Sequence, residues 1–122
     1  MINIFTIKQA AEVLNISSSM IRYYDKEGLL PFIKKDENGY RQFSENDLFW
    51  LEFIRCMRAT NMSISTLRLV AELYMQGNET LEKRKQIFKG HKENLVKQKR
   101  DIEEALDKLD QKFYLLNKES SI

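Results

Sequence analysis

The segment from Ser17 to Tyr24 combines helix-capping hydroxyls with side chains that bind nucleic acids. Ser17 and Ser18 can cap a short helix, because serine oxygens accept hydrogen bonds from the unpaired N–H groups of a first turn. Arg22, Tyr23 and Tyr24 follow one turn later. On a helix surface, guanidinium and phenol groups can bind phosphate oxygens and base edges in a DNA groove. We therefore predict that this segment contacts DNA, with the two serines as caps first and phosphate donors second.

A structural alternative stays open for the same side chains. Tyr24 could be a core residue, and Arg22 could pair with Asp25 instead of binding a ligand. We assign Arg22, Tyr23 and Tyr24 to the DNA-binding surface, with Tyr24 the weakest of the three assignments.

A second short helix precedes this segment. Apolar residues at positions 7, 10, 11 and 14 have the spacing of one face of an amphipathic helix. Thr6 and Gln9 form a capping box at its start. Two short helices joined by about three residues predict a helix-turn-helix, although any other helical hairpin would share this pattern. Gly28 is expected to end the second helix in a left-handed conformation.

A hairpin is predicted around Asn38-Gly39, which separates two β-prone runs, residues 32–35 and 40–43. A lone two-stranded hairpin is only marginally stable in water, so it must pack on the helices as the wing of a winged helix. The alternative role of its polar residues is simply to solvate one side of the hairpin. We assign three of its side chains as phosphate clamps, namely Lys34, Tyr40 and Arg41.

Two further helices are expected after the hairpin. Ser44 caps a helix that runs to about Thr60, and its apolar residues leave little polar face, so the helix should be largely buried. These residues are Leu48, Phe49, Trp50, Leu51, Phe53, Ile54, Cys56 and Met57. Ser63 opens the next helix, after Asn61 has stopped the first. Its predicted buried stripe consists of Ile64, Leu67, Val70, Ala71 and Tyr74.

Residues 80–117 contain no proline and repeat an apolar residue every seven positions, a pattern typical of a coiled coil. After Leu81, the repeat continues with the predicted dimerisation residues Phe88, Leu95, Ile102, Leu109 and Leu116. Because no second long helix can cover this stripe, we predict a homodimer. The expected fold is mainly α. A winged helix-turn-helix domain with two supporting helices covers residues 1–76, and a dimerisation helix with a short tail covers residues 77–122.

Composition narrows the function classes. With one histidine and one cysteine, the chain has no set of residues for a metal site or a nucleophilic active site, so we expect neither an enzyme nor a cofactor. Residues 1–60 carry eight Lys and Arg against eight Asp and Glu, so attraction to DNA must come from local placement of charge. One cysteine, no signal peptide and no apolar run of about 20 residues predict a cytoplasmic protein.

Four phrases of the sequence resemble the MerR family of bacterial transcription regulators. They are Ile21–Asp25, Gly28–Pro31, Asn38–Arg41 and Phe43–Leu48. Segment Trp50–Arg58 resembles the single-cysteine, aldehyde-responsive AdhR/NmlR-like branch of that family. The chain departs from the metal-sensing members, which carry further cysteines near the end of the dimerisation helix. It also lacks room for the C-terminal drug-binding domain of the multidrug regulators.

The resemblance implies a homodimer on a near-palindromic promoter operator, shared with RNA polymerase, that acts by bending and untwisting an overlong promoter spacer. It also implies that Arg58 reaches the DNA backbone from the third helix, and that Cys56 senses an electrophile or oxidant in a stress response. From sequence alone, a small core residue with an inert thiol is the favoured interpretation of Cys56, and only the resemblance to this branch makes a sensor comparable to it. A neighbouring Arg55 or Arg58 would favour the thiolate that a sensor needs.

Two other classes of protein remain as alternatives. An effector-independent architectural protein, similar to an excisionase, would share the winged helix, although small excisionases usually lack a long dimer coil. A coiled-coil adaptor without a DNA role would leave the cluster of Arg22, Tyr23 and Tyr24 unexplained.

Overall fold

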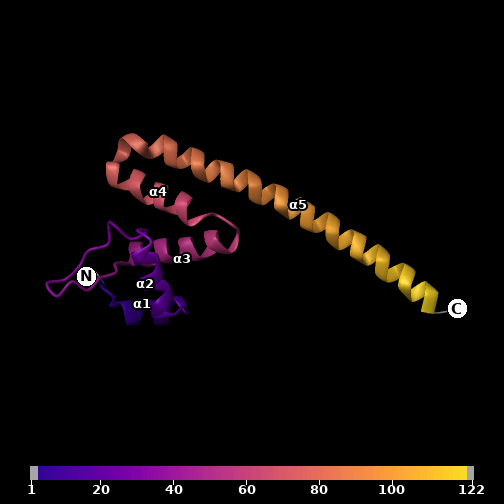
Figure 1. Cartoon of the computed structure of the whole chain (residues 1–122), viewed down its shortest axis with the longest axis horizontal. Coiled ribbons are helices and arrows are strands. Elements are labelled where there is room, and N and C mark those ends of the chain that lie inside the picture. Colours follow the sequence, from indigo (N-terminus) through magenta and orange to yellow (C-terminus); the bar gives the residue numbers. More distant parts are fainter. Residues whose placement is uncertain (1–2, 121–122) are drawn as a thin grey trace. The chain divides into compact units, whose positions relative to one another are not determined.

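The computed structural model describes residues 3–120, which form five α-helices and one short 3-10 helix (Figure 1). The helices are α1 (Ile7–Leu14), α2 (Ser18–Lys26), α3 (Glu45–Ala59), α4 (Ile64–Gln76) and α5 (Leu81–Ser120), with the 3-10 helix η1 (Asn78–Thr80) before α5. By packing, the chain divides into two compact units, one ending at Lys85 and the other beginning at Gln86. Within the described residues, no helix combines the length and apolar character that a membrane crossing requires.

Side-chain caps fix the starts of α1 and α2, as the sequence predicts. The Gln9 N–H donates to Thr6 Oγ1 at 3.1 Å, and the Thr6 N–H donates to Gln9 Oε1 at 2.9 Å, which completes the capping box. Asn15 ends α1 in the left-handed conformation, with φ of 54°. Two residues later, Ser17 Oγ accepts a hydrogen bond from the Met20 N–H at 3.0 Å and starts α2. These two helices form the predicted helix-turn-helix.

The end of α2 is a Schellman motif centred on Gly28. Its φ of +79° is the left-handed value predicted from the sequence. The Leu29 N–H donates to the Tyr24 carbonyl and the Gly28 N–H donates to the Asp25 carbonyl, both at 3.0 Å. Leu29 and Leu30 are buried directly afterwards, so the chain leaves α2 through the core on its way to the wing.

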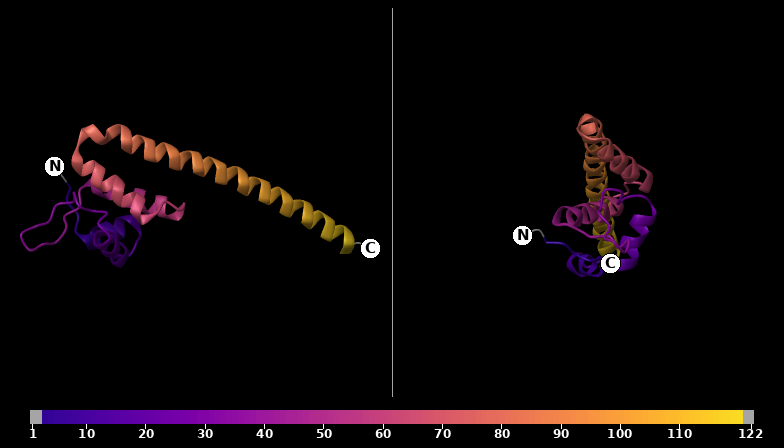
Figure 2. Two further views of the ribbon diagram at one scale, coloured as in Figure 1. Left: turned by 45° about the horizontal axis from the view of Figure 1, so that its top comes forward. Right: turned by 90° about the vertical axis from the view of Figure 1, so that its left-hand side faces the viewer.

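The wing, residues 33–42, extends as a loop from the helices of the first unit (Figure 2). Asp36 organises its turn, since its Oδ1 atom accepts hydrogen bonds from the Asn38 N–H at 2.9 Å and the Tyr40 N–H at 3.0 Å. Gly39 has φ of +84°, whereas Asn38 does not enter the left-handed region. The predicted hairpin turn is therefore present, with Gly39 alone in the left-handed region, but the two β-prone runs around it form no regular strand in residues 3–120.

Pairing along the wing is short. The Gln42 N–H donates to the Lys34 carbonyl at 2.8 Å, and Lys35 and Arg41 form an isolated antiparallel bridge. A second bridge joins Phe43, which is fully buried, to Phe5 near the start of the chain. Backbone pairing thus ties the base of the wing to the N-terminal segment and leaves its tip exposed.

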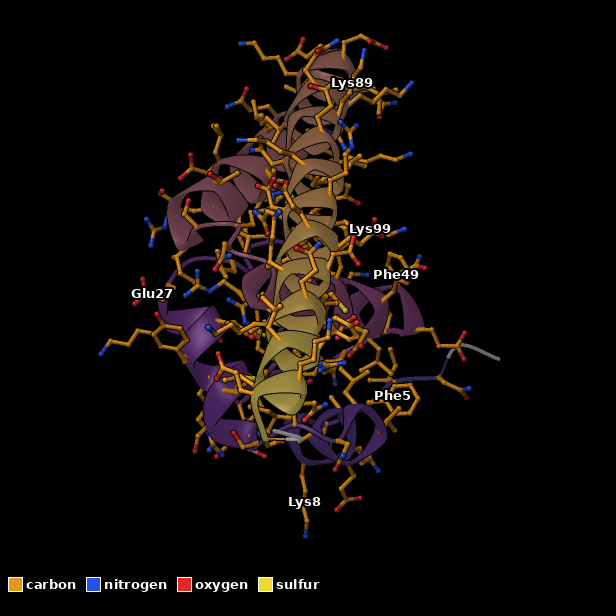
Figure 3. All side chains as sticks on the ribbon, turned by 90° about the vertical axis from the view of Figure 1, so that its right-hand side faces the viewer. Phe5, Lys8, Glu27, Phe49, Lys89 and Lys99 are labelled. Carbon is orange, nitrogen blue, oxygen red and sulfur yellow. The ribbon has the colours of Figure 1, made fainter. Side chains whose placement is uncertain are left out.

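Helix α3 is less buried than predicted. Of the eight apolar residues expected to be covered, only Leu48, Leu51 and Ile54 are buried, and these lie on one face of the helix. The prediction was wrong for Phe49, which is 73% exposed and points away from the helix (Figure 3), and for Cys56, which is exposed. A helix packed on one side buries only about a third of its residues, however many of them are apolar.

Helix α4 buries three of the five residues of the predicted stripe, and Ile64 at its start is only partly buried. Leu67, Val70 and Ala71 are buried as expected, and Leu73 joins them. Tyr74, predicted to be buried, is 54% exposed. It still makes contacts, because its ring packs edge-on against Phe32 with centroids 5.0 Å apart.

An aromatic chain links α4, the entry to the wing and α3. Phe32 lies between Tyr74 and Trp50, and its ring centroid is 5.8 Å from that of the indole. Trp50 stacks on Phe53 and donates its Nε1 hydrogen to the Leu29 carbonyl at 2.9 Å. The indole therefore holds together the segment after α2 and helix α3.

Candidate DNA-binding surface

Helix α2 presents one continuous polar face to solvent. Its exposed residues Ser19, Arg22, Tyr23 and Lys26 follow the spacing i, i+3, i+4 and i+7, and we call them the reading face. The opposite side is anchored by Ile21, which is 1% exposed. Two cations and no carboxylate lie on the reading face, so it is locally positive.

Arg22 is available to a ligand. Its side chain is exposed, and across residues 3–120 it makes no hydrogen bond and no ion pair. The alternative pairing with Asp25 is not found, because Asp25 pairs with Arg41 of the wing instead. Tyr23, the next residue of the reading face, is 46% exposed.

Tyr24 lies in the core, at 4% exposure, which favours the alternative assignment of this residue over a DNA contact. Burial raises the pKa of its phenol above the usual value, and the nearby guanidinium groups of Arg58 and Arg55 partly offset that increase. Tyr24 therefore supports the reading face from beneath, with its ring 6.1 Å from that of Tyr23.

The three wing residues predicted to clamp phosphates divide into two kinds. Lys34 is exposed, and Tyr40 is 70% exposed. Arg41 differs, because only 18% of its side chain is exposed and its guanidinium is bonded to Asp25 at 2.9 and 3.2 Å. Lys34 and Tyr40 can meet a phosphate as they stand, whereas Arg41 is already engaged within the protein.

The remaining predicted contacts have structural partners. Ser17 Oγ caps α2, and Ser18 in the first turn is half-buried. Arg58 is exposed near the end of α3, where one guanidinium N–H donates to the Met62 carbonyl at 2.9 Å. The other hydrogen-bonding groups of its guanidinium can still bind a phosphate.

A groove of about 470 Å³ separates the wing from α2 and the N-terminal segment. Arg22, Tyr40 and Thr6, the N-cap residue of α1, are among its lining residues. The groove therefore places a residue of the reading face and a wing residue around one concave surface.

Sequence reasoning missed part of this surface. Ser19 and Lys26 belong to the reading face, and their helical spacing from Arg22 and Tyr23 was a usable signal. The pairing of Asp25 with Arg41 had no such signal, because the two residues are 16 positions apart.

Cys56 lies at the surface, so the inert core alternative does not describe it. Its Sγ atom donates a weak hydrogen bond to Glu52 Oε1, one turn earlier, at 3.7 Å. The Arg55 guanidinium also donates to the Glu52 carboxylate. This hydrogen bond from Arg55 is the main reason that the pKa of Glu52 is lowered. In the described part of the chain, no group of three or more metal-ligating side chains is present.

The predicted dimerisation residues lie along one side of α5, and three of the five are exposed in the single chain. Ile102, Leu109 and Leu116 are 60%, 54% and 44% exposed, and Phe88 and Leu95 are partly exposed.

Residues 5–73 match the family model of the MerR HTH family regulatory proteins, which covers more than half of the chain. The chain belongs to the MerR family of transcription regulators. An uncharacterised HTH-type regulator of Haemophilus influenzae is 36% identical over 118 residues, which cover 97% of this chain and 87% of that protein.

Two further comparisons support the AdhR/NmlR-like branch within the MerR family. AdhR of Bacillus subtilis is 36% identical over 90 residues, which cover 74% of this chain and 64% of AdhR. The crystal structure of HiNmlR, described as a MerR family regulator lacking the sensor domain and bound to promoter DNA, matches with a TM-score of 0.87 and 35% identity. That match covers 98% of this chain and 95% of HiNmlR. The family resemblance of the sequence is thus confirmed.

Proposed function

We propose that this MerR-family regulator binds promoter DNA as a homodimer, with the reading face of each α2 in the major groove and the wing on the phosphate backbone. The observation that carries the proposal is the availability of Arg22, an exposed cation without an ion-pair partner among residues 3–120, on a helix held beside a wing with exposed Lys34 and Tyr40. Arginine in the major groove discriminates guanine through bidentate hydrogen bonds.

The proposed action on transcription is distortion of the promoter. Two reading faces on one rigid dimer would contact the two halves of a near-palindromic operator, while RNA polymerase occupies the same promoter. Bending or untwisting such a site costs several kcal/mol, which phosphate contacts can offset. The structural match to a MerR regulator bound to promoter DNA covers 98% of this chain. This match supports promoter distortion over the action of an excisionase-like architectural protein.

We further propose that modification of Cys56 by an aldehyde, a quinone or an oxidant switches the bound dimer. Exposure of the thiol supports this, because a reagent can reach it. With a single cysteine per chain, oxidation would end in a mixed disulfide, a bridge between subunits or an adduct. In a promoter reporter, Cys56→Ser should keep operator binding and lose induction by methylglyoxal or a quinone; induction at the parental level would exclude this switch.

The DNA-binding proposal is tested with duplexes taken from the promoters beside the gene of this protein. Fluorescence anisotropy should show salt-dependent binding that prefers one dyad sequence over scrambled DNA. Arg22→Ala should lower operator affinity by about 1–3 kcal/mol and relax discrimination at one base step. Equal binding of parent and variant to every duplex would overturn the assignment of the reading face.

A further inference from the structure

The guanidinium of Arg41 joins three segments of the first unit. It makes a bidentate contact with the Asp25 carboxylate of α2, with Nη2–Oδ1 at 2.9 Å and Nε–Oδ2 at 3.2 Å. Its remaining Nη1 group donates to the Ile33 carbonyl, on the opposite arm of the wing. One side chain thus ties together both arms of the wing and the helix that carries the reading face.

This contact is the only hydrogen-bonded connection between α2 and the wing within residues 3–120. In the described part of the chain, the wing's other backbone hydrogen bonds are internal, such as that from the Gln42 N–H to the Lys34 carbonyl, or join Ile33 to the Leu30 carbonyl just before the wing, and none of them reaches α2. Without the guanidinium, the hairpin keeps its own turn and pairing but loses its polar attachment to α2.

We propose that the Asp25–Arg41 pair is a positioning lock that sets the distance between base-reading and phosphate-binding groups. The inference rests on the proposed function, because it concerns how Arg22 on α2 and Lys34 on the wing reach one DNA duplex together. Arg41 is a positioning residue here, since its bidentate contact leaves 18% of its side chain exposed. A planar guanidinium suits this task, because its fork fixes direction as well as distance.

The lock and a phosphate clamp predict opposite effects of Asp25→Asn. If Arg41 were a clamp restrained by Asp25, removing the carboxylate charge would release a cation, so DNA binding would tighten and its salt dependence would steepen. If the pair is a lock, the wing loses its position, operator affinity falls about tenfold, and the salt slope becomes shallower by about one for each lost phosphate contact.

Glu27→Gln is a matched control at the C-cap of the same helix. Glu27 has nearly the same side-chain exposure as Asp25, 31% against 34%, and its ion pair with Arg68 at 3.0 Å ties the end of α2 to α4 rather than to the wing. Both substitutions remove one negative charge, so their shared electrostatic effect cancels in the comparison. Glu27→Gln should bind the operator as tightly as the parent or slightly more tightly.

Arg41→Lys keeps the positive charge but cannot form the bidentate fork. The lock predicts that it binds as weakly as Asp25→Asn, whereas a clamp predicts nearly parental affinity. Thermal unfolding followed by circular dichroism verifies that both variants fold.

A measurement without DNA separates the lock from the proposed function. In a Cys56→Ser background, a nitroxide on Asn38→Cys at the wing tip broadens amide resonances of α2 according to their distance. Asp25→Asn should change this pattern while the Asp36 and Gln42 amides stay protected from exchange, and Glu27→Gln should not. An unchanged pattern in Asp25→Asn, or tighter operator binding by it, overturns the lock. A changed pattern in a protein that binds no DNA refutes the proposed function and leaves the wing attachment in place.

Discussion

Truncating Leu109 tests whether the apolar stripe of α5 joins two chains. The side chain is 54% exposed in the single chain, so about half of its burial remains to be gained. Full burial of a leucine is worth about 1.5–3 kcal/mol, and each dimer contains two copies. Leu109→Ala should therefore weaken the dimer by about 1.5–3 kcal/mol, a factor of roughly 10–150 in its dissociation constant.

Sedimentation equilibrium measures this constant, and Val96→Ala is the control. Val96 is 42% exposed on the same helix but lies one position after Leu95, outside the stripe. Its truncation should leave the constant nearly unchanged, since alanine also suits the helix. Equal weakening by both variants, or none by Leu109→Ala, would refute the seven-residue stripe as the dimer contact. A parent protein that is monomeric at micromolar concentration would refute the dimer itself.

Three further outcomes follow from individual contacts. Lys34→Ala should weaken binding to all DNA sequences alike and make the salt slope shallower by about one, as anisotropy titrations at several salt concentrations would show. Thr80 is buried and its hydroxyl donates to the Leu73 or Gly77 carbonyl, so Thr80→Val should cost about 1–3 kcal/mol in urea unfolding, and Thr80→Ser much less. Because burial raises the pKa of Tyr24, its phenol ionises first in the unfolded chain, and stability should fall as pH rises through the folded pKa; Tyr24→Phe should remove that part of the alkaline loss in denaturation measured against pH.

Local signals in the sequence were sufficient for the helix ends and the wing turn. The capping box of Thr6 and Gln9 and the left-handed Gly28 each depend on hydrogen bonds within about five residues, so residue type and spacing determine them. The seven-residue repeat likewise predicted a long helix, which α5 confirms.

Burial was predicted less well, because it depends on which face of a helix meets a neighbour. Phe49 and Tyr74 are both apolar in character, yet they lie on faces that the first unit leaves open. The spacing of Leu48, Leu51 and Ile54 is typical of a buried helix face. Other apolar residues lie between them, so the sequence did not show which face is buried. In α3, the number of apolar residues exceeded what one packed face can cover.

Ion pairs between distant residues carried no sequence signal. Asp25 with Arg41 and Glu27 with Arg68 are separated by 16 and 41 positions. Several other partners were equally plausible for each carboxylate, including Arg22 for Asp25. Only the fold decides which cation each carboxylate meets, and that choice determines which cations remain for DNA.

The pairing of particular carboxylates with particular cations explains how a formally neutral N-terminal half can attract DNA. Its eight cations and eight carboxylates cancel in the sum, but Asp25 in α2 pairs with the wing and Glu27 at the C-cap of α2 pairs with α4. Asp36 is likewise occupied by backbone N–H groups of the wing turn. Arg22, Lys26 and Lys34 then remain exposed without ion-pair partners in the described part of the chain. Because screened interactions fall off within about 10 Å at 0.1 M salt, a phosphate at this surface responds to these nearby cations rather than to the net charge.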